Sequence, residues 1–334
     1  MSSPALPALA LRCHGGLTPQ QCVEQAVAAE RAGFSTIWFA ENPFGRGAWP
    51  AAAACAVATR RVRLGPGILN PHQRHPTLMA MEIAAFDELS AGRAVLGIGA
   101  GMPSRLRKTH APVDRPIAAV RDAVTITRAL LRGDTVTYSG KAFSTDGVRL
   151  DFAPRRADLP ILTAAMGPQA LRLCGEIADG VIVSNLVPAA FTRRAVAIIG
   201  ESAARMSRSA PREIVQYVPA AIREDGAEAR RLAKRSVAAM LTAYAQSASA
   251  ATRAAMSEFA RPEDLEHAMR GLARGEAPED AIGDPLLAEY AIAGTPDECL
   301  AQAKAYAQAG VTELAITPLG EHAADDVARL GRAI

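Results

Sequence analysis

Short apolar runs alternate with helical patterns almost from one end of this 334-residue chain to the other. Such alternation is typical of βα units, in which helices connect parallel strands. The runs are apolar at consecutive positions, as strands are when both of their faces are buried. Eight of them, each after the first preceded by a helical pattern, favour an α/β fold of the (β/α)8 TIM-barrel class over a doubly wound sheet. The expected strands are 8–13, 36–40, 62–69, 94–101, 161–165, 181–184, 214–222 and 312–318.

Several helix boundaries are marked by residues that cap or end helices. Thr18 and Thr295 each precede a proline, which places a capping side chain before proline at the first helical position. Gly33 and Gly310 each follow an alanine shortly before an expected strand, where glycine is suited to end a helix. These signals predict helices between the first two strands and before the last one.

Two segments do not fit a plain barrel. Residues 135–152 are polar and predict a hairpin inserted before the fifth strand. Residues 226–287 are too long for one helix and predict several helices packed outside the barrel or over its mouth. No low-complexity linker divides the chain, so we expect residues 1–334 to form a single domain with insertions near 135–152 and 226–287.

Composition narrows the class of protein. The net charge of +3 is well mixed and contains no basic run, which argues against nucleic-acid and membrane-surface partners. The five scattered cysteines include no CxxC pair, and the few histidines lack ligand spacing, so neither a disulfide framework nor a metal site is expected. No signal peptide or membrane-spanning run is recognisable. We therefore expect a soluble cytoplasmic enzyme with a small-molecule substrate.

Glycines cluster where the third and fourth expected strands end. Gly65 and Gly67 flank a proline in one, and Gly97, Gly99 and Gly101 alternate along the other. Proline inside a central strand predicts a bulge, and glycine allows backbone or a ligand to approach closely. The pattern predicts either a cofactor site at the carboxyl ends of parallel strands or only tight turns and close packing. Its spacing does not match a dinucleotide-binding fingerprint.

The turn after the fifth expected strand leads into a helix that begins near Pro168. Amide groups at a helix N-terminus attract anions, and Gly167 allows a ligand to approach the backbone. The alternative is a plain strand–helix turn with proline at the first helical position. The amides around Met166–Gln169 are the candidate anion site, and the candidate cofactor-binding residues of this turn are Ala165, Met166, Gly167, Pro168 and Gln169.

Several motifs together resemble the bacterial luciferase-like superfamily of flavin- and deazaflavin-dependent oxidoreductases. Gly-Pro-Gly-Ile-Leu-Asn-Pro at 65–71 is followed by Arg-His-Pro at 74–76, and Leu-Gly-Ile-Gly-Ala-Gly stands at 96–101. Further matching segments, in the same order as in the superfamily, are 28–39, 87–93, 160–169 and 175–180. Within the superfamily, the chain most resembles the branch of coenzyme F420-dependent methylenetetrahydromethanopterin reductases.

This resemblance implies an oxidoreductase that transfers a hydride between coenzyme F420 and a small organic substrate, and that forms a homodimer or higher homo-oligomer. It also implies a non-proline cis peptide at Gly67–Ile68 beneath the middle ring of the cofactor, with an ordinary trans bulge as the alternative. The turn at 165–169 would hold the cofactor phosphate. Asn70 and Gly99, which belong to the neighbouring motifs, complete the candidate cofactor-binding residues.

The candidate catalytic residues, Glu41 and Asn42, follow the second strand, where many relatives carry Asp-His or Glu-His. Glu41 is suited to general acid–base catalysis or to holding a polar edge of the cofactor, and a solvated loop carboxylate is the alternative. Met102 stands where sugar-phosphate-oxidising relatives have glutamate. Together with Asn42, it argues against a sugar-phosphate dehydrogenase.

The cofactor class stays open between coenzyme F420 and FMN, which would serve a monooxygenase that uses reduced flavin and O2. A third hypothesis is a barrel that only binds a flavin or a partner. His75, before Pro76, predicts a helix cap rather than a catalytic base. Four cations after strand ends are suited to the long anionic tail of F420 or are solvated surface charges: Arg74, Arg105, Arg107 and Lys108.

Overall fold

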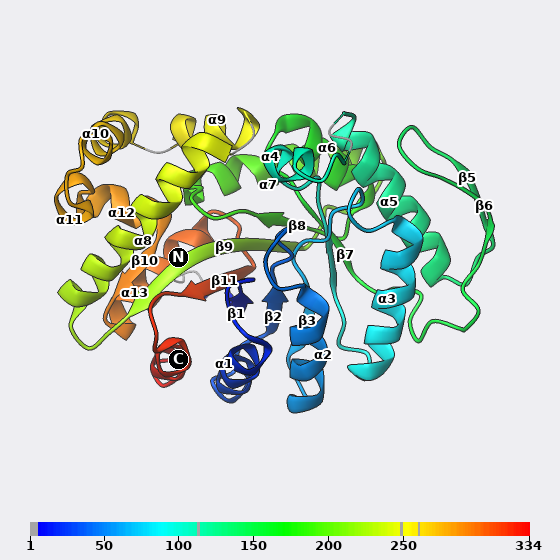
Figure 1. Cartoon of the computed structure of the whole chain (residues 1–334), viewed down its shortest axis with the longest axis horizontal. Helices are drawn as coiled ribbons and strands as arrows, with labels where there is room; N and C mark the ends of the chain where they lie inside the picture. The colour runs from blue at the N-terminus through cyan, green and yellow to red at the C-terminus, as the bar shows by residue number, and fades with distance from the viewer. Residues whose placement is uncertain (1–5, 112–113, 248–249, 260) are drawn as a thin grey trace.

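The computed structural model describes residues 6–111, 114–247, 250–259 and 261–334, and in them a parallel eight-stranded barrel is surrounded by helices (Figure 1). The strands follow one another around the barrel in sequence order, and β1 pairs with the last strand to complete the circle. The predicted (β/α)8 barrel is therefore confirmed. The barrel strands are β1 (Ala8–Cys13), β2 (Thr36–Phe39), β3 (Arg63–Pro66), β4 (Leu96–Ile98), β7 (Ile161–Ala164), β8 (Gly180–Val183), β9 (Glu213–Ile222) and β11 (Glu313–Pro318).

Closure between β3 and β4 is irregular, and we call this junction the β3–β4 seam. On one side of it, the Leu64 amide donates to Arg93 O at 3.0 Å and Leu64 O accepts from the Val95 amide at 3.0 Å. On the other side, the Leu69 amide donates to Gly97 O at 2.8 Å. Residues 65–68 between these contacts form a bulge, as the proline predicted. The bulge interrupts the ladder, which is why β3 and β4 are shorter than the expected 62–69 and 94–101.

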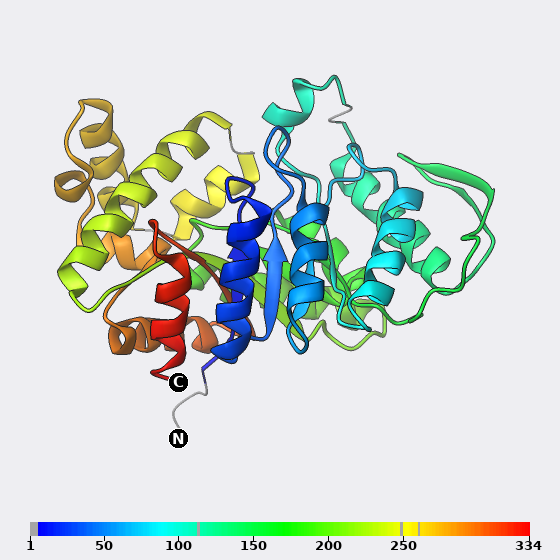
Figure 2. The ribbon, with the colours of Figure 1, turned by 60° about the horizontal axis from the view of Figure 1, so that its bottom comes forward.

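Helices cover the outside of the barrel, and the first and last of them lie side by side (Figure 2). Thr18 and Thr295 both form complete capping boxes, and Gly33 adopts φ +81° after the first helix, as predicted. The barrel helices are α1 (Pro19–Arg31), α2 (Ala48–Ala58), α3 (Pro76–Leu89), α4 (Pro103–Arg107), α5 (Pro116–Leu131), α6 (Pro168–Ile177), α7 (Ala189–Arg205), α13 (Pro296–Gln308) and α14 (Ala323–Gly331).

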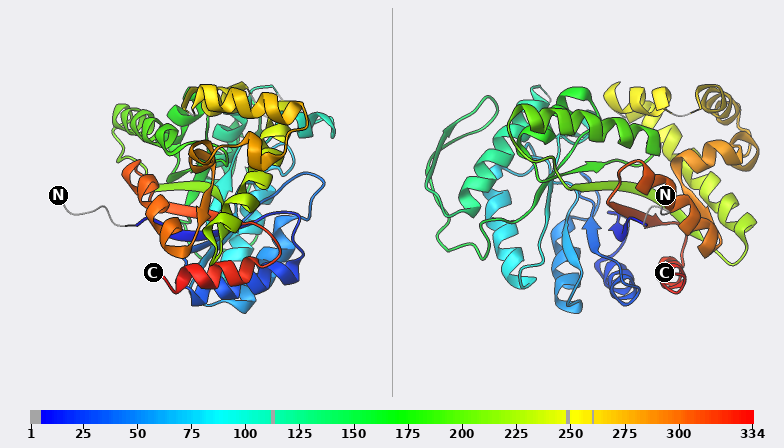
Figure 3. Two further views of the ribbon diagram at one scale, coloured as in Figure 1. Left: turned by 90° about the vertical axis from the view of Figure 1, so that its left-hand side faces the viewer. Right: turned by 180° about the vertical axis from the view of Figure 1, so that it is seen from behind.

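The two insertions lie on opposite sides of the barrel (Figure 3). The first is the predicted antiparallel hairpin of β5 (Val136–Ser139) and β6 (Ser144–Val148). The second contains helices, as predicted, and ends in a short strand, β10 (Ile292–Gly294), that sequence analysis missed. This strand pairs with the last three residues of β9, beyond the part of β9 that pairs with β8. The helices are α8 (Gly226–Ser247), α9 (Ala250–Phe259), α10 (Pro262–Ala273), α11 (Pro278–Ala281) and α12 (Asp284–Tyr290).

A buried polar network closes the amino-terminal end of the barrel. The Glu313 carboxylate, 5% exposed, accepts hydrogen bonds from Thr36 Oγ1 at 2.7 Å and from Trp38 Nε1 at 2.8 Å. Arg63 pairs with Glu313 at 3.2 Å and with Glu213 at 2.9 Å. These interacting side chains fill the amino-terminal end of the barrel, so we expect a ligand to enter from the carboxyl ends of the strands. No helix in the described residues is long and apolar enough to cross a membrane.

Substitution of Gly65 tests the β3–β4 seam. A Cβ atom at this position would overlap the Val95 carbonyl oxygen, which is backbone and cannot rotate away. We expect Gly65→Ala to lower the free energy of unfolding by about 3 kcal/mol, at the upper end of the usual cost of overpacking. The matched control is Gly200→Ala in α7, where a Cβ meets nothing within 4 Å, so that stability should stay unchanged or rise. Urea unfolding measures both, and equal stabilities would contradict this account.

Candidate functional site

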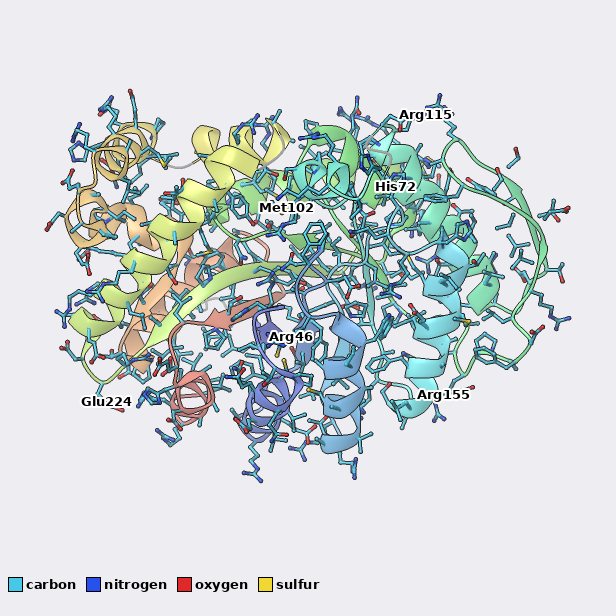
Figure 4. The ribbon with its side chains drawn as sticks, viewed as in Figure 1. Arg46, His72, Met102, Arg115, Arg155 and Glu224 are labelled. Atoms are coloured by element: carbon cyan, nitrogen blue, oxygen red, sulfur yellow. The ribbon has the colours of Figure 1, made fainter. Side chains whose placement is uncertain are left out.

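A cavity of about 560 Å³ opens at the carboxyl ends of the barrel strands. Ile68, Ala164 and Ile182 supply apolar walls, while Tyr244 of α8 and Ala251 of α9 close it from the second insertion. We call α8 and α9 the roof of the site. Figure 4 shows His72 and Met102, which also line the cavity, at the upper end of the barrel and Arg155 at its lower end. The second insertion therefore packs over the barrel mouth, which was one of its two predicted positions.

The β3 bulge lies directly at the cavity. The Gly67–Ile68 peptide is cis, as the resemblance implied, and both residues line the cavity. The Gly67 amide donates to Phe39 O at 2.8 Å, and Gly67 O accepts from Tyr217 Oη at 3.3 Å. The bulge is thus held from β2 and β9 at once. Its contact with a cofactor ring stays a prediction.

Asn70 connects the ends of β3 and β4. Its side-chain amide donates to Ala100 O, and its Oδ1 accepts from the His72 amide at 2.8 Å. Gly101 faces it with φ +69°, a backbone conformation that glycine adopts without strain. Asn70 is 4% exposed and still lines the cavity, so its position fits the predicted site while its hydrogen bonds serve the loop.

Two predicted cofactor-binding residues, Gly99 and Ala165, do not line the cavity. A Cβ at Gly99 would lie 3.1 Å from the Ile68 side chain and 3.0 Å from Ala164 Cβ, so this glycine makes room for the bulge. Ala165 is 2% exposed and packs with α6 and α7. Both residues pack behind the cavity wall in this structure, and their contact with a cofactor stays a prediction. Close packing inside the barrel was the alternative for the β4 glycines.

The turn between β7 and α6 faces the cavity through Met166, Gly167, Pro168 and Gln169. Gly167 is the N-cap of α6 and has no side chain to cap the helix, so the Gln169 and Ala170 amides have no partner within the helix. A Cβ at Gly167 would lie 3.2 Å from Ala251 Cβ on the roof. The helix dipole and these amides favour an anion at this position.

Glu41 lines the cavity, but both of its carboxylate oxygens have partners in this chain. Oε2 accepts from the Ala48 amide at 2.6 Å, at the start of α2, and Oε1 pairs with Arg74 at 2.9 Å. Arg74 also pairs with Glu82 at 2.6 Å. Glu41 is therefore neither a solvated loop carboxylate nor a free acid–base group. Its catalytic role stays a prediction. Asn42 also lines the cavity, and its role is likewise untested.

The arginines and histidines that follow β3 and β4 differ in what they contact. Arg74 binds carboxylates of this chain, so it does not reach toward an anionic ligand. Arg105 lines the cavity and donates to Pro43 O at 2.8 Å. His75 caps α3 by accepting from the Thr77 amide at 3.3 Å, which confirms the predicted cap. Burial lowers the pKa of His72, which keeps that imidazole neutral at pH 7.

Several residues line the cavity that were not predicted from the sequence, and Arg12 and Tyr217 are the most informative of them. The Arg12 guanidinium lies over the Tyr217 ring, 4.9 Å from its centroid. Burial raises the pKa of Tyr217, so the phenol stays protonated and donates to the β3 bulge. The available signal was a single arginine inside the apolar run of the first strand, because charged side chains are rarely buried unless they have a partner or a ligand.

The amino-acid sequence matches the family model for luciferase-like monooxygenases over residues 5–313. It is 31% identical over 313 residues to 5,10-methylenetetrahydromethanopterin reductase of Archaeoglobus fulgidus, covering 92% of each chain. Identity to the enzyme of the same name from Methanolobus tindarius is 28%, over 92% of this chain and 93% of that one. The structure of coenzyme F420-dependent tetrahydromethanopterin reductase from Methanopyrus kandleri superposes with a TM-score of 0.86, 24% identity and 99% coverage of both chains.

Substitution of Glu41 separates its structural role from the predicted catalytic one. We expect Glu41→Gln to lower the free energy of unfolding by about 1–2 kcal/mol, because it weakens charge-assisted hydrogen bonds to Arg74 and to the start of α2. Glu24→Gln on exposed α1 is the control and should change stability by less than about 0.5 kcal/mol. Turnover should stay within about tenfold of the wild type. A loss of 100-fold or more at unchanged stability, typical of a missing general acid or base, would contradict the structural account.

Proposed function

Because the chain belongs to the luciferase-like monooxygenase family, we propose that it is an oxidoreductase that transfers a hydride between coenzyme F420 and a small organic substrate. The reductases named above cover nearly the whole chain and support this activity over the others in the family. The observation that carries the proposal is the pairing of an apolar cavity with an anion-binding turn at one edge. Those two features match a cofactor that has a flat ring and a phosphate.

The residues at the site fit such a cofactor. Ile68, Ala164 and Ile182 offer apolar surface for a ring, and the cavity volume of about 560 Å³ is within the range of small-molecule sites. The missing side chain of Gly167 leaves the α6 amides open to a phosphate. Arg105 lies at the cavity, and Arg107 and Lys108 are exposed on the adjacent segment. These three cations would hold a long anionic tail.

When bound, F420 supplies the hydride-carrying carbon, C5, of its deazaflavin ring. The chain positions the reactants and excludes water. Ile68 and the β3 bulge orient the ring, and the α6 amides hold its phosphate end. Tyr244 and Ala251 on the roof shield the reacting face from solvent. The Glu41–Arg74 pair keeps the loop after β2 in place.

Equilibrium titration with both cofactors tests the proposal. We expect quenching of F420 fluorescence at micromolar or lower concentration and weaker binding of FMN. The loaded enzyme should then oxidise reduced F420 when given 5,10-methylenetetrahydromethanopterin, the substrate in the names of its relatives. Tight binding of FMN without measurable F420 binding would overturn the choice of cofactor and favour a flavin-dependent monooxygenase.

Substitution of Gly167 tests the phosphate turn. We expect Gly167→Val to weaken F420 binding by about tenfold or more, because the side chain occupies the space between the α6 amides and the roof. Gly167→Ala should have a smaller effect, since its Cβ meets only Ala251 at 3.2 Å. Gly200→Ala serves again as the control and should bind F420 normally. Normal F420 affinity in a folded Gly167→Val variant would place the phosphate elsewhere.

The proposal also covers domain organisation, cellular location and oligomeric state. Residues 1–334 act as one domain, a proposal supported by the pairing of β1 with β11. The enzyme works in the cytoplasm as a homodimer or a larger homo-oligomer. Light scattering of the purified protein measures the oligomeric state, and a monomer at micromolar concentration would contradict it.

A further inference from the structure

Arg12 is an arginine of the cavity that lacks a partner for its charge. The side chain is half-buried at the end of β1, and its Nε is fully buried without a hydrogen-bond partner in the described part of the chain. Within the described residues, its only hydrogen bond runs from Nη1 to Thr317 Oγ1, and at 3.4 Å it is weak. The Tyr217 ring covers one face of the guanidinium, which leaves most of its N–H donors without an acceptor.

Other inward-facing arginines of this fold show what a structural role requires. Arg63 and Arg74 each pair with two carboxylates, and in Arg74 these pairs neutralise the charge although its Nε is also buried without a hydrogen-bond partner. Arg93 has no carboxylate partner among the described residues, yet its Nε and both terminal nitrogens donate to backbone and hydroxyl oxygens at 2.7–3.2 Å. Among the described residues, no salt bridge and no comparable set of oxygens is recorded for Arg12. Burying donors without acceptors costs free energy, so packing alone does not explain this residue.

The position of Arg12 separates it from the phosphate turn. The strands run around the barrel as β1, β2, β3, β4, β7, β8, β9 and β11, so β1 and β7 stand on opposite sides. The α6 amides follow β7, Ile68 lies between the two positions after β3, and Arg12 extends from β1. A cofactor whose phosphate is held at α6 and whose ring rests on Ile68 therefore leaves Arg12 to another ligand. Thr317 and Tyr217, from β11 and β9, flank the guanidinium on this side.

We propose that Arg12 binds an oxyanion of the substrate, a carboxylate or phosphate group, and so selects anionic substrates. A planar guanidinium binds such a group through two parallel hydrogen bonds, and an apolar cavity strengthens them. The Tyr217 ring holds the guanidinium in one plane, so little side-chain freedom is lost on binding. This assignment rests on the proposed function, because it takes the substrate to occupy the part of the cavity that the cofactor leaves free.

Binding of size-matched probes tests the assignment. Benzoate and benzamide differ in charge but scarcely in shape, and phenylphosphonate separates a preference for phosphoryl groups from one for carboxylates. Ligand-observed NMR titration of the F420-saturated protein at fixed ionic strength measures their dissociation constants. We expect benzoate or phenylphosphonate to bind at least about tenfold more tightly than benzamide, as a charge-assisted hydrogen-bond pair provides. Equal binding of all three would overturn the assignment.

Variants of single arginines test whether Arg12 causes the preference for anionic probes. Arg12→Gln should reduce the ratio of anion to benzamide affinity to about one, and Arg12→Lys should keep part of it. Arg31→Gln, on the exposed end of α1, is the remote control and should keep the whole ratio. Persistence of the ratio in Arg12→Gln, or its loss in Arg105→Gln alone, would overturn the proposal. The proposal would also be overturned if Arg12→Gln weakened F420 binding while the ratio of anion to benzamide affinity stayed unchanged.

Two further measurements keep the result independent of folding and of the cofactor. A crystal structure of the wild-type protein with benzoate should show its carboxylate within hydrogen-bond distance of the Arg12 guanidinium, and a carboxylate elsewhere would contradict the assignment. If the chain binds no F420, the same probe comparison is made on the FMN-loaded or cofactor-free protein. Failure of F420 binding and failure of the Arg12 assignment are then observed separately.

Discussion

Closure of the barrel between β3 and β4 is the constraint on which the rest of the structure depends. A barrel has no free edge only if every strand pairs with both of its neighbours. In this barrel, the bulge at residues 65–68 interrupts the pairing between β3 and β4. Hydrogen bonds on either side of the bulge keep the circle closed, and glycines at 65 and 97 allow the two backbones to approach. The same bulge places Ile68 on the cavity wall. Closing the fold and shaping the site are therefore one event.

The two ends of the barrel handle polar side chains in opposite ways. At the amino-terminal end, the Glu313 carboxylate accepts hydrogen bonds from the Thr36 hydroxyl, the Trp38 indole and the Arg63 guanidinium. At the carboxyl end, the Glu41 carboxylate has partners for both of its oxygens, whereas the Arg12 Nε is buried without an acceptor in the described part of the chain. Unmatched donors destabilise the folded chain by themselves, and binding of a ligand that accepts from them offsets that cost.

The fold followed from the sequence because its signals are local. Strand periodicity, the Thr-Pro helix starts and the alanine–glycine helix ends each report on a few neighbouring residues. Contacts between distant segments were harder to predict. The strand β10, for example, has only three residues and is defined by its pairing with β9. At the site, the motifs located the bulge and the α6 turn. They did not show that Gly99 packs against Ile68 and Ala164, which come from other segments. They also overlooked Arg12 and Tyr217, whose significance appears only when β1 and β9 both pair with β11.

The roof packs in a hydrophobic cluster that is distinct from the main core of the barrel and that also takes in α12 and Ala221 of β9. Val237 and Leu241 of α8 pack with Leu286 and Tyr290 of α12, and the Tyr290 hydroxyl donates to Met256 O on α9 at 3.2 Å. Tyr244 and Ala251, which face the cavity, project from helices that lie outside the ring of eight barrel strands. Their side chains can therefore change without altering the strand pairing that closes the barrel, while the walls supplied by the strands stay the same.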